Sequence, residues 1–353
     1  MQIPPLTPPF KGGGFVALDI GGANLKAADG LGYARSRPFA LWRTPELLAV
    51  ELQTLISEAP RCDRLAVTMT GELADCYATK AIGVRSILQG VESAAAGRSI
   101  IVYLTTGKWA TLDEAREAPQ LAAASNWRAL ATYANRFASS WPALLIDMGS
   151  TTADVIPLRE SGPCPAGLTD TERLVASELV YTGVERTPVS AIVRQLPWSG
   201  ESCPVASELF ATSADAYLLL GEIPEDAQSG DTADGRPMTR PAAHARMARM
   251  ICADATSFTE ANSQAAAIAV RNAQLATLET AVRNVAARLG QPPQTLILSG
   301  QGEFLLRRLA ARLPWRCEVL SLTKESGAEV SRCAPAHALA VLARETWPTR
   351  ASE

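Results

Sequence analysis

Two short segments constrain this chain most, because each takes an apolar strand directly into a turn of small residues and out again. They are DIGGANLK at 19–26 and DMGSTTAD at 147–154. Each begins within an apolar run, 15–20 or 143–148, of the kind that forms a buried strand. Glycine lets successive backbone amides converge on an oxyanion without a Cβ clash, and such amide groups bind phosphate. The two aspartates are 147 − 19 = 128 residues apart, so the pattern indicates two related lobes and not a short repeat.

The composition fits a globular α/β protein of two lobes. The chain has 353 residues, of which 47% are hydrophobic and only 6% aromatic, so we expect a core of Ala, Leu and Val. The 36 acidic and 33 basic residues nearly balance, which argues against a nucleic-acid partner. No apolar run reaches the ~18 residues of a membrane-spanning helix, so we expect no membrane partner. A homo-oligomer is compatible with this composition.

The cysteines and histidines argue against a structural metal site. The seven cysteines have no C-x-x-C spacing, and the two histidines stand in no metal-spaced cluster. We therefore expect reduced thiols in a cytoplasmic protein.

Hydrophobic periodicity predicts alternating strands and helices. Strands are expected at 15–20, 24–29, 64–70, 99–105, 143–148, 153–158 and 295–299. Helices are expected at 45–59, 81–96, 121–140, 240–255, 260–289, 304–313 and 335–346. The region 160–240 is rich in Pro, Gly, Thr and Asp, and we expect mainly loops that carry binding residues there. The expected division is a disordered leader at 1–14, lobe I at 15–140, lobe II at 141–347 with a C-terminal helix that packs back on lobe I, and a tail at 348–353.

A third glycine turn, SGQGE at 299–303, lies between a predicted strand and a predicted helix, a position that suits an anion or a nucleoside. One such turn alone is equally typical of a plain β-hairpin, but three in corresponding places favour a phosphate site. Lys26 would add a positive charge, and Asp19 and Asp147 are candidates to hold Mg²⁺ directly or through water. The expected phosphate-binding residues are Gly21, Gly22, Asn24, Gly149, Ser150, Thr151, Thr152, Gly300, Gln301 and Gly302.

Together, the three turns resemble the superfamily of sugar kinases, actin and heat-shock chaperones, over about residues 15–347. The resemblance implies an actin-like ATPase fold, in which two ribonuclease-H-like lobes clamp phosphates in a central cleft. That superfamily hosts many chemistries, so the fold alone does not decide the function.

Longer strings narrow the resemblance to one family. They are VTMTGELAD at 67–75, ASNWRALA at 124–131, LLIDMGSTTADVIPL at 144–158, GLTDTERL at 167–174, ELVYTGVERTPV at 178–189, ELFATSADAYLLLG at 208–221 and TADGRP at 232–237. With these strings the chain resembles the hydantoinase-A-related family named for the tetrahydromethanopterin-linked one-carbon transfer pathway.

This resemblance implies a transferase of methanofuran biosynthesis. A furanylmethyl diphosphate with an aminomethyl group would be joined to the phenol of γ-glutamyltyramine, or of a tyrosine-containing equivalent, with release of pyrophosphate. Amide groups and Mg²⁺ would stabilise the charge that develops on the departing diphosphate. The phenol, with a pKa of about 10, needs a base, and the two organic partners need in-line positioning. The fold would then clamp a diphosphate substrate rather than ATP.

The resemblance also nominates side chains for this chemistry. Glu72 and Asp75 follow a strand in TGELAD, where the base of a sugar-kinase-like enzyme would point into the cleft, although acids there also suit a helix N-terminus. The first loop has Ala23 and Asn24 where many kinases of the superfamily have Ser or Thr, which weakens an ATP role for it. The catalytic candidates are Asp19, Lys26, Glu72, Asp75 and Asp147. The substrate-binding candidates are Asp170, Arg173, Glu178, Tyr181, Arg186, Thr187, Asp234 and Arg236.

Two other functions compete with this interpretation. The complete phosphate clamp also suits an ATP-dependent enzyme, either a small-molecule kinase or a hydantoinase-like amidohydrolase. A non-catalytic nucleotide-binding regulatory protein is the alternative from another class. It is disfavoured because we find no long insert and no separate peptide-binding domain in the sequence.

Overall fold

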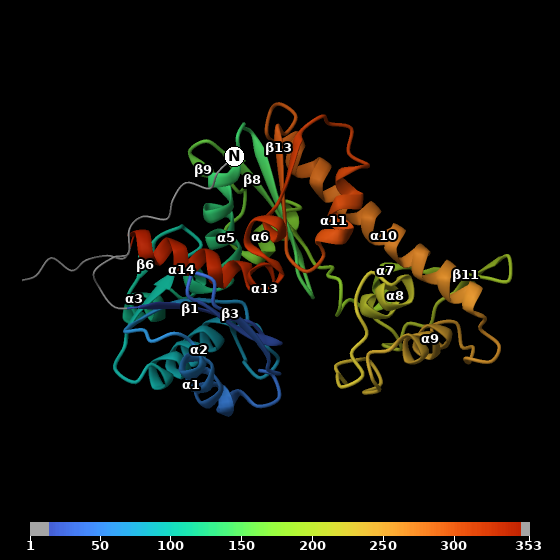
Figure 1. Cartoon of the computed structure of the whole chain (residues 1–353), viewed down its shortest axis with the longest axis horizontal. Coiled ribbons are helices and arrows are strands. Elements are labelled where there is room, and N and C mark those ends of the chain that lie inside the picture. Colours follow the sequence, from blue (N-terminus) through green and yellow to red (C-terminus); the bar gives the residue numbers. More distant parts are fainter. Residues whose placement is uncertain (1–13, 347–353) are drawn as a thin grey trace, which may run out of the picture.

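The computed structural model describes residues 14–346, which form two α/β lobes and a smaller third unit (Figure 1). The predicted tail at 348–353, and all of the predicted leader except Gly14, lie outside these residues. Among the described residues, all seven cysteines are free, and no helix has both the length and the apolar character needed to cross a bilayer.

Lobe I is built on a six-stranded sheet in the order β3-β2-β1-β4-β5-β6. β1, β4 and β5 run parallel, whereas β2 and β3 form an antiparallel meander beside β1, and β6 is antiparallel to β5. The strands are β1 Phe15–Ile20, β2 Asn24–Ala28, β3 Ala34–Pro38, β4 Arg64–Met69, β5 Ser99–Tyr103 and β6 Trp109–Ala110. The helices are η1 Pro45–Leu47, α1 Leu48–Glu58, α2 Lys80–Ala94, α3 Leu112–Glu117 and α4 Pro119–Ala122.

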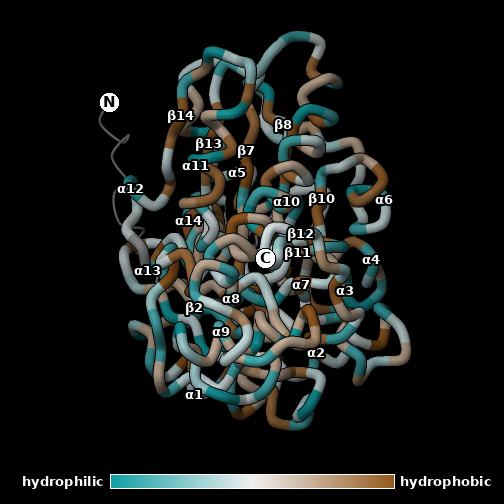
Figure 2. Tube along the Cα trace, turned by 90° about the vertical axis from the view of Figure 1, so that its right-hand side faces the viewer, coloured by the Kyte–Doolittle hydropathy of each residue, from teal (hydrophilic) through white to brown (hydrophobic). Residues whose placement is uncertain are grey.

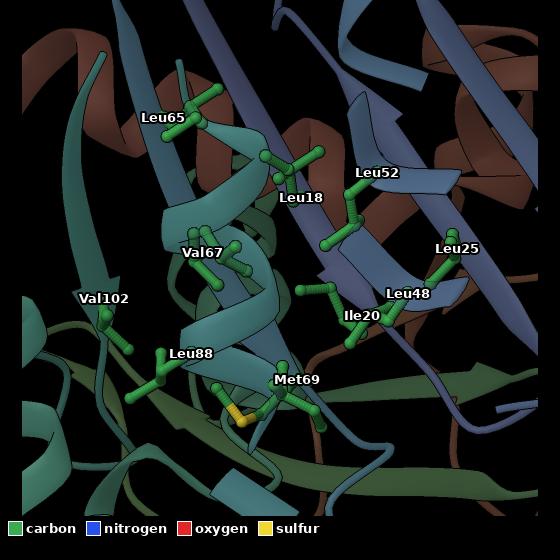
Figure 3. Close-up of a cluster of buried hydrophobic side chains, with 14 of the residues drawn as sticks. Leu18, Ile20, Leu25, Leu48, Leu52, Leu65, Val67, Met69, Leu88 and Val102 are labelled. Carbon is green, nitrogen blue, oxygen red and sulfur yellow. The ribbon is translucent and has the colours of Figure 1, made fainter. Parts of the chain in front are cut away.

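The two faces of β1 pack against different helices, as the period of two in a strand requires. Leu18 and Ile20 pack with Leu52 of α1 and Leu88 of α2 in one buried cluster (Figure 3). Phe15, Ala17 and Ala66 face the other way, into a cluster with Leu339 and Ala343 of the C-terminal helix α14, Ala334–Thr346. Asp19 continues this second face to the end of the strand, so its carboxylate points away from the main core of lobe I.

Lobe II repeats the same plan on the strand order β10-β8-β7-β13-β14, with β9 beside β8. β7, β13 and β14 run parallel. On the other side of β7, β8 is antiparallel to β7, and β10 is antiparallel to β8. Strand order and direction therefore match the first five strands of lobe I, which confirms the expected actin-like arrangement of two ribonuclease-H-like lobes. The strands are β7 Ala143–Met148, β8 Ala153–Arg159, β9 Gly162–Pro163, β10 Leu179–Val180, β13 Thr295–Ser299 and β14 Glu318–Ser321.

Helices enclose the lobe II sheet from both sides. Figure 2 shows hydrophobic residues along β7 and β13, within the surrounding helices. One face packs against α10 Glu260–Ala287 and α11 Glu303–Ala310, and the other against α5 Asn126–Ala134 and α14. α14 contacts β1 of lobe I as well as α5, so it joins the two lobes. The remaining helices here are η2 Asn135–Phe137, α6 Asp170–Val175, α12 Leu322–Ser326 and α13 Ala328–Arg332.

The third unit has its own apolar core at the far end of α10, which runs out from lobe II (Figure 1). Its elements are α7 Val189–Ile192, β11 Gln195–Trp198, β12 Glu201–Pro204, α8 Ser213–Leu220 and α9 Arg240–Arg249. Loops make up most of the range 160–240, as expected, but the short helices and strands within it were not predicted. Most elements in that range have only two to eight residues and too few apolar positions to produce a periodic signal.

Two further expectations differ from the structure. The helix expected at 121–140 is divided, because Ala124 has a φ of 49° and separates α4 from α5. The strands β3 and β14 were missed, since Ala34–Pro38 is largely polar and Glu318–Ser321 is short. The division at Ala124 has a consequence for the site, because it places the start of α5 at the cleft.

Candidate active site

A cavity of about 590 Å³ lies between the lobes, and the two glycine loops face each other across it. Most side chains predicted from the sequence line this one cavity. They are Asp19, Gly21, Gly22, Asn24, Lys26, Glu72, Asp75, Asp147, Gly149, Ser150, Thr151, Thr152, Asp170, Arg173, Tyr181, Arg186, Gly300 and Gln301.

The two loops have the same backbone construction. In the first, the Gly21 N–H donates to the Asn24 carbonyl at 3.0 Å, and in the second the Gly149 N–H donates to the Thr152 carbonyl at 2.9 Å. The second loop is supported from behind by Gly183, where an added Cβ would lie 2.3 Å from the Ser150 carbonyl. The glycine in the family string around residue 183 is therefore explained by close packing against the second glycine loop.

The third glycine turn closes onto the second loop. Gly300 has a φ of 88°, and an added Cβ there would lie 2.8 Å from Asp147 Oδ1 and 2.4 Å from the Met148 carbonyl. Only glycine meets both the conformational and the steric requirement. Gly302 does not line the cavity. Its N–H donates to the Met148 carbonyl at 2.9 Å, so it supports the turn.

Asp19 and Asp147 present buried carboxylate oxygens that need a partner. Within residues 14–346, neither Asp19 Oδ1 nor Asp147 Oδ1 has a hydrogen-bond partner. Burial raises the pKa of Asp19, against the opposing effect of Lys26, and burial together with the neighbouring Asp154 raises the pKa of Asp147 to about 6. A cation between the two carboxylates would relieve both effects.

The donor set suits Mg²⁺ better than an all-protein metal cage. Among the described residues, no group of three or more His, Cys, Asp or Glu side chains is arranged to hold a metal. Mg²⁺ is usually held by one or two carboxylates, with water and substrate phosphates as the other ligands. Two orphaned carboxylate oxygens in a cavity lined by two glycine loops fit that pattern.

The register of the sheets places opposite charges at corresponding positions. Asp19 pairs across the strands with Lys26 in lobe I, whereas Asp147 pairs with Asp154 in lobe II. The strand order places β2 on one side of β1 and β4 on the other, so Lys26 and Glu72 flank Asp19 from opposite sides. The cavity lining therefore carries Lys26 on β2 and Glu72 after β4, and Asp154 on β8 is paired with Arg173.

Glu72 is a buried carboxyl group of the cavity with a strongly raised pKa. Its side chain is 1% exposed, and no hydrogen-bond partner among residues 14–346 reaches its Oε2 atom. Burial raises the pKa of Glu72 to about 7, although Lys80 lies 3.8 Å away and opposes this rise. Asp75, by contrast, is exposed at the cavity. Of the two predicted candidates, Glu72 is better placed to act as a base near neutral pH.

Two of the predicted substrate residues that line the cavity, Arg173 and Asp170, also make contacts that hold the structure together. Arg173 is 1% exposed, contacts Asp154 at 2.5 Å and stacks its guanidinium 4.2 Å from the Trp127 ring centroid. Its main role is to hold the wall of the cavity. Asp170 contacts Lys80 of lobe I at 2.8 Å, so it bridges the cleft.

Two cavity residues lie on the surface near the opening. Tyr181 is 66% exposed. The Arg186 guanidinium lies 5.0 Å from the Trp42 ring centroid, which makes a second contact between the lobes.

Four predicted substrate residues lie outside the cavity. Glu178 is fully buried, accepts a hydrogen bond from the Ala166 N–H and is paired with Arg288. The Thr187 hydroxyl accepts a hydrogen bond from the Gly183 N–H. Asp234 is held by Arg246 and Arg249 in the third unit, and Arg236 is exposed beside it. These four residues therefore stabilise or flank local turns, which accounts for the polar segments in which they lie.

Several cavity residues were missed. Asn126 and Trp127 line the cavity at the start of α5, and the string ASNWRALA contained them without singling them out. Asp154 also lines it, within the second loop string. Trp42 and Lys80 had no signal in the sequence, because the contacts that bring them to the cleft come from the other lobe.

Comparison with known proteins identifies the family. The model of the hydantoinase/oxoprolinase family matches residues 63–346. A protein of Methanocaldococcus jannaschii, named (4-{4-[2-(gamma-L-glutamylamino)ethyl]phenoxymethyl}furan-2-yl)methanamine synthase, is 32% identical over 331 residues, which cover 93% of this chain and 96% of that one. A protein of the same name from Methanococcus vannielii is 30% identical over 201 residues, covering 56% of this chain and 89% of its own.

Solved structures of similar overall shape are more distant. The activator of a 2-hydroxyisocaproyl-CoA dehydratase from Clostridium difficile covers 94% of each chain at 11% identity and a TM-score of 0.43. An archaeal actin homologue covers 94% of this chain and 100% of its own at 11% identity and a TM-score of 0.42. The fold class rests on the strand order of the two sheets, and the family on the sequence matches. The chain belongs to the hydantoinase/oxoprolinase family.

Proposed function

We propose that this chain is a transferase of methanofuran biosynthesis. It joins a furanylmethyl diphosphate to the phenol of γ-glutamyltyramine, or of a tyrosine-containing equivalent, and releases pyrophosphate. The observation that carries the proposal is the cavity itself, where two loops suited to phosphate face a buried carboxyl group with a pKa of about 7. The printed name of the relatives, which describes a phenoxymethyl furan product, supports the same chemistry.

The reaction needs one bond to break and one to form. The bond between the furanylmethyl carbon and the diphosphate oxygen breaks, and its electron pair leaves with pyrophosphate. The phenol oxygen forms the new bond to that carbon, and its proton passes to Glu72. A carboxylate of pKa about 7 accepts this proton better than an ordinary carboxylate, because the pKa difference from a phenol of about 10 is smaller.

The loops serve the departing group. The residues Gly21 to Asn24 and Gly149 to Thr152 line the part of the cavity where the anionic end of the substrate would lie, and Lys26 would add a positive charge there. Asp19 and Asp147 would hold Mg²⁺, which when bound would neutralise part of the diphosphate charge. These groups act on charge that increases as the bond breaks, so they favour the transition state over the bound substrate.

The direct test is incubation of the purified chain with Mg²⁺, the furanylmethyl diphosphate and γ-glutamyltyramine. We expect pyrophosphate release only when the phenol is present, together with an ether product of the matching mass. Absence of the ether by mass spectrometry, with either phenolic partner, would contradict the proposal. ATP hydrolysis or phosphorylation of the phenol in a parallel incubation would instead favour an ATP-dependent enzyme.

A further inference from the structure

Lys80 stands between two carboxylates that belong to different lobes. Its Nζ lies 2.8 Å from Asp170 Oδ2 in lobe II and 3.8 Å from Glu72 Oε1 in lobe I. One ammonium group is therefore shared between a partner across the cleft and the group that we assign as the base.

Lys80 and Glu72 belong to one rigid part of lobe I. Thr79 caps α2 by accepting the Ile82 N–H at 3.2 Å, which fixes the first turn that carries Lys80. Gly83 in the next turn approaches so closely that an added Cβ would lie 2.1 Å from the Glu72 carbonyl. Asp170, in contrast, is the first residue of α6 in lobe II. Separation of the lobes would therefore break the Asp170 contact and leave Lys80 beside Glu72.

The charges around Glu72 act in opposite directions. Burial and the Asp170 carboxylate raise the pKa of Glu72, whereas Lys80 and the backbone N–H of Ala124, just before α5, lower it. Two other carboxylates, Asp75 and Asp154, line the same cavity, and Asp154 is paired with Arg173. If lobe II moved away, the Asp170 charge would leave and water would reach Glu72, and both changes favour the ionised form.

We propose that Lys80 is a positioning residue through which closure of the two lobes makes Glu72 a stronger base. When the lobes are closed, Asp170 draws the Lys80 ammonium group away from Glu72, and the phenol proton passes to a carboxylate that holds it more firmly. When they are open, Lys80 turns back to Glu72 and weakens it as a base. This inference rests on the proposed function only in naming Glu72 as the base.

The charge on Glu72 is measured without substrate, by carbon-13 NMR of protein labelled at the glutamate side-chain carboxyl. Glu72→Gln identifies the signal. We expect Lys80→Met to raise the pKa of Glu72 by about 1–3 units, because an opposite charge within hydrogen-bonding range is lost. Asp170→Asn should lower it, since the like charge is removed and Lys80 is released to Glu72.

Two variants serve as controls. Lys80→Arg keeps the positive charge and should stay near the wild-type value. Lys108→Met removes an exposed lysine that does not line the cavity, and should leave the titration unchanged. Thermal unfolding of each variant checks that the fold is intact.

The acid limb of the pH–rate profile for ether formation should move in the same directions. Lys80→Met should regain activity at higher pH, which a merely misfolded variant would not do. Shifts of the same sign in Lys80→Met and Asp170→Asn, or no shift in either, would overturn the inference while leaving the proposed function in place. Opposite shifts in a wild-type protein that makes no ether would leave the charge coupling intact and reject the proposed function.

Discussion

At the scale of single residues, Glu72 combines two properties that rarely occur together, near-complete burial and an unpaired carboxylate oxygen. Its raised pKa has a consequence for stability, because the folded chain binds this proton more tightly than the unfolded chain does. The stabilising contribution is complete below the ordinary glutamate pKa and is lost as the pH rises through about 7.

We therefore expect Glu72→Gln to be more stable than the wild type at pH 8, by up to about 3 kcal/mol, since each pKa unit corresponds to about 1.36 kcal/mol. At pH 4 the two proteins should differ little, because Glu72 is then neutral as well. Urea unfolding at the two pH values measures the difference. Glu92→Gln, which replaces an exposed glutamate, should show no such dependence on pH. A loss of stability in Glu72→Gln at pH 8 would show that the interaction with Lys80 stabilises the ionised carboxylate by more than burial destabilises it.

Asp147 leads to a different expectation, because its orphaned oxygen lies at the third glycine turn and the residue lines the same cavity as both loops. Asp147→Asn, and more severely Asp147→Ala, should lower turnover by roughly 100-fold, the scale of losing one transition-state contact. Thermal unfolding should be little changed, since a buried charge with a pKa raised to about 6 is removed. Comparing initial rates with the unfolding midpoint distinguishes the two effects. Equal losses of turnover and stability would make Asp147 structural.

The sequence was a good guide to residues whose role depends on the local backbone. Asp19, Gly21, Asp147 and Gly149 were identified because strand, turn and glycine lie next to one another in the chain. Lys80 could not be found in this way, because its importance comes from Asp170, ninety residues further on and in the other lobe.

At the scale of elements, the second loop depends on the segment behind it. The N–H groups of Val184 and Arg186 donate to the carbonyls of Gly149 and Ser150 at 3.1 and 3.0 Å. This segment is held in turn by Gln274 of α10, whose amide donates to the Gly183 carbonyl at 2.9 Å.

Gly183→Ala should therefore displace the second loop, because the new Cβ would collide with the Ser150 backbone. We expect a loss of about 1–3 kcal/mol in unfolding free energy, typical of overpacking, and roughly tenfold weaker pyrophosphate binding. Isothermal titration with Mg²⁺ and pyrophosphate measures the second effect. Gly90→Ala, in α2 and away from the cavity, tests for a general effect of the substitution. Unchanged pyrophosphate affinity in Gly183→Ala would show that this loop does not hold the anion.

Strands formed by continuous apolar runs were predicted well, whereas short or polar strands were predicted poorly. The runs at 15–20, 143–148 and 295–299 are strands as expected, because they are continuous apolar segments that end at glycine. The hairpin β11–β12 has only four residues in each strand, and each strand contains a proline, so no periodic pattern marks it. Its stability comes from the core it shares with α10, which is a tertiary effect.

At the scale of the whole molecule, side-chain contacts between Lys80 and Asp170 and between Trp42 and Arg186 join the lobes at the cleft. Arg186→Gln removes the second, a cation–π contact worth about 0.5–1 kcal/mol. We expect amide hydrogen exchange in the two glycine loops to become about 2–5-fold faster, the factor that corresponds to this energy.

The matched control is Arg283→Gln, which removes an exposed ion pair with Glu279 on α10. Exchange in the loops should not respond to it. If both variants accelerated exchange equally, or if Arg186→Gln had no effect, the Trp42 contact would not hold the lobes together.

The pairing of Asp19 with Lys26, and of Asp147 with Asp154, leads us to expect that a bound diphosphate has a preferred direction. A diphosphate is nearly the same from either end, and two loops of one construction would accept it either way round. Reversed charges at corresponding places make the two orientations unequal. Under the proposed function, we expect the diphosphate end of the substrate to lie toward Lys26 and its carbon end toward Glu72, on the other side of β1. The two lobes therefore share one framework but differ in charge at corresponding positions, so the two ends of the cleft are not equivalent for a bound diphosphate.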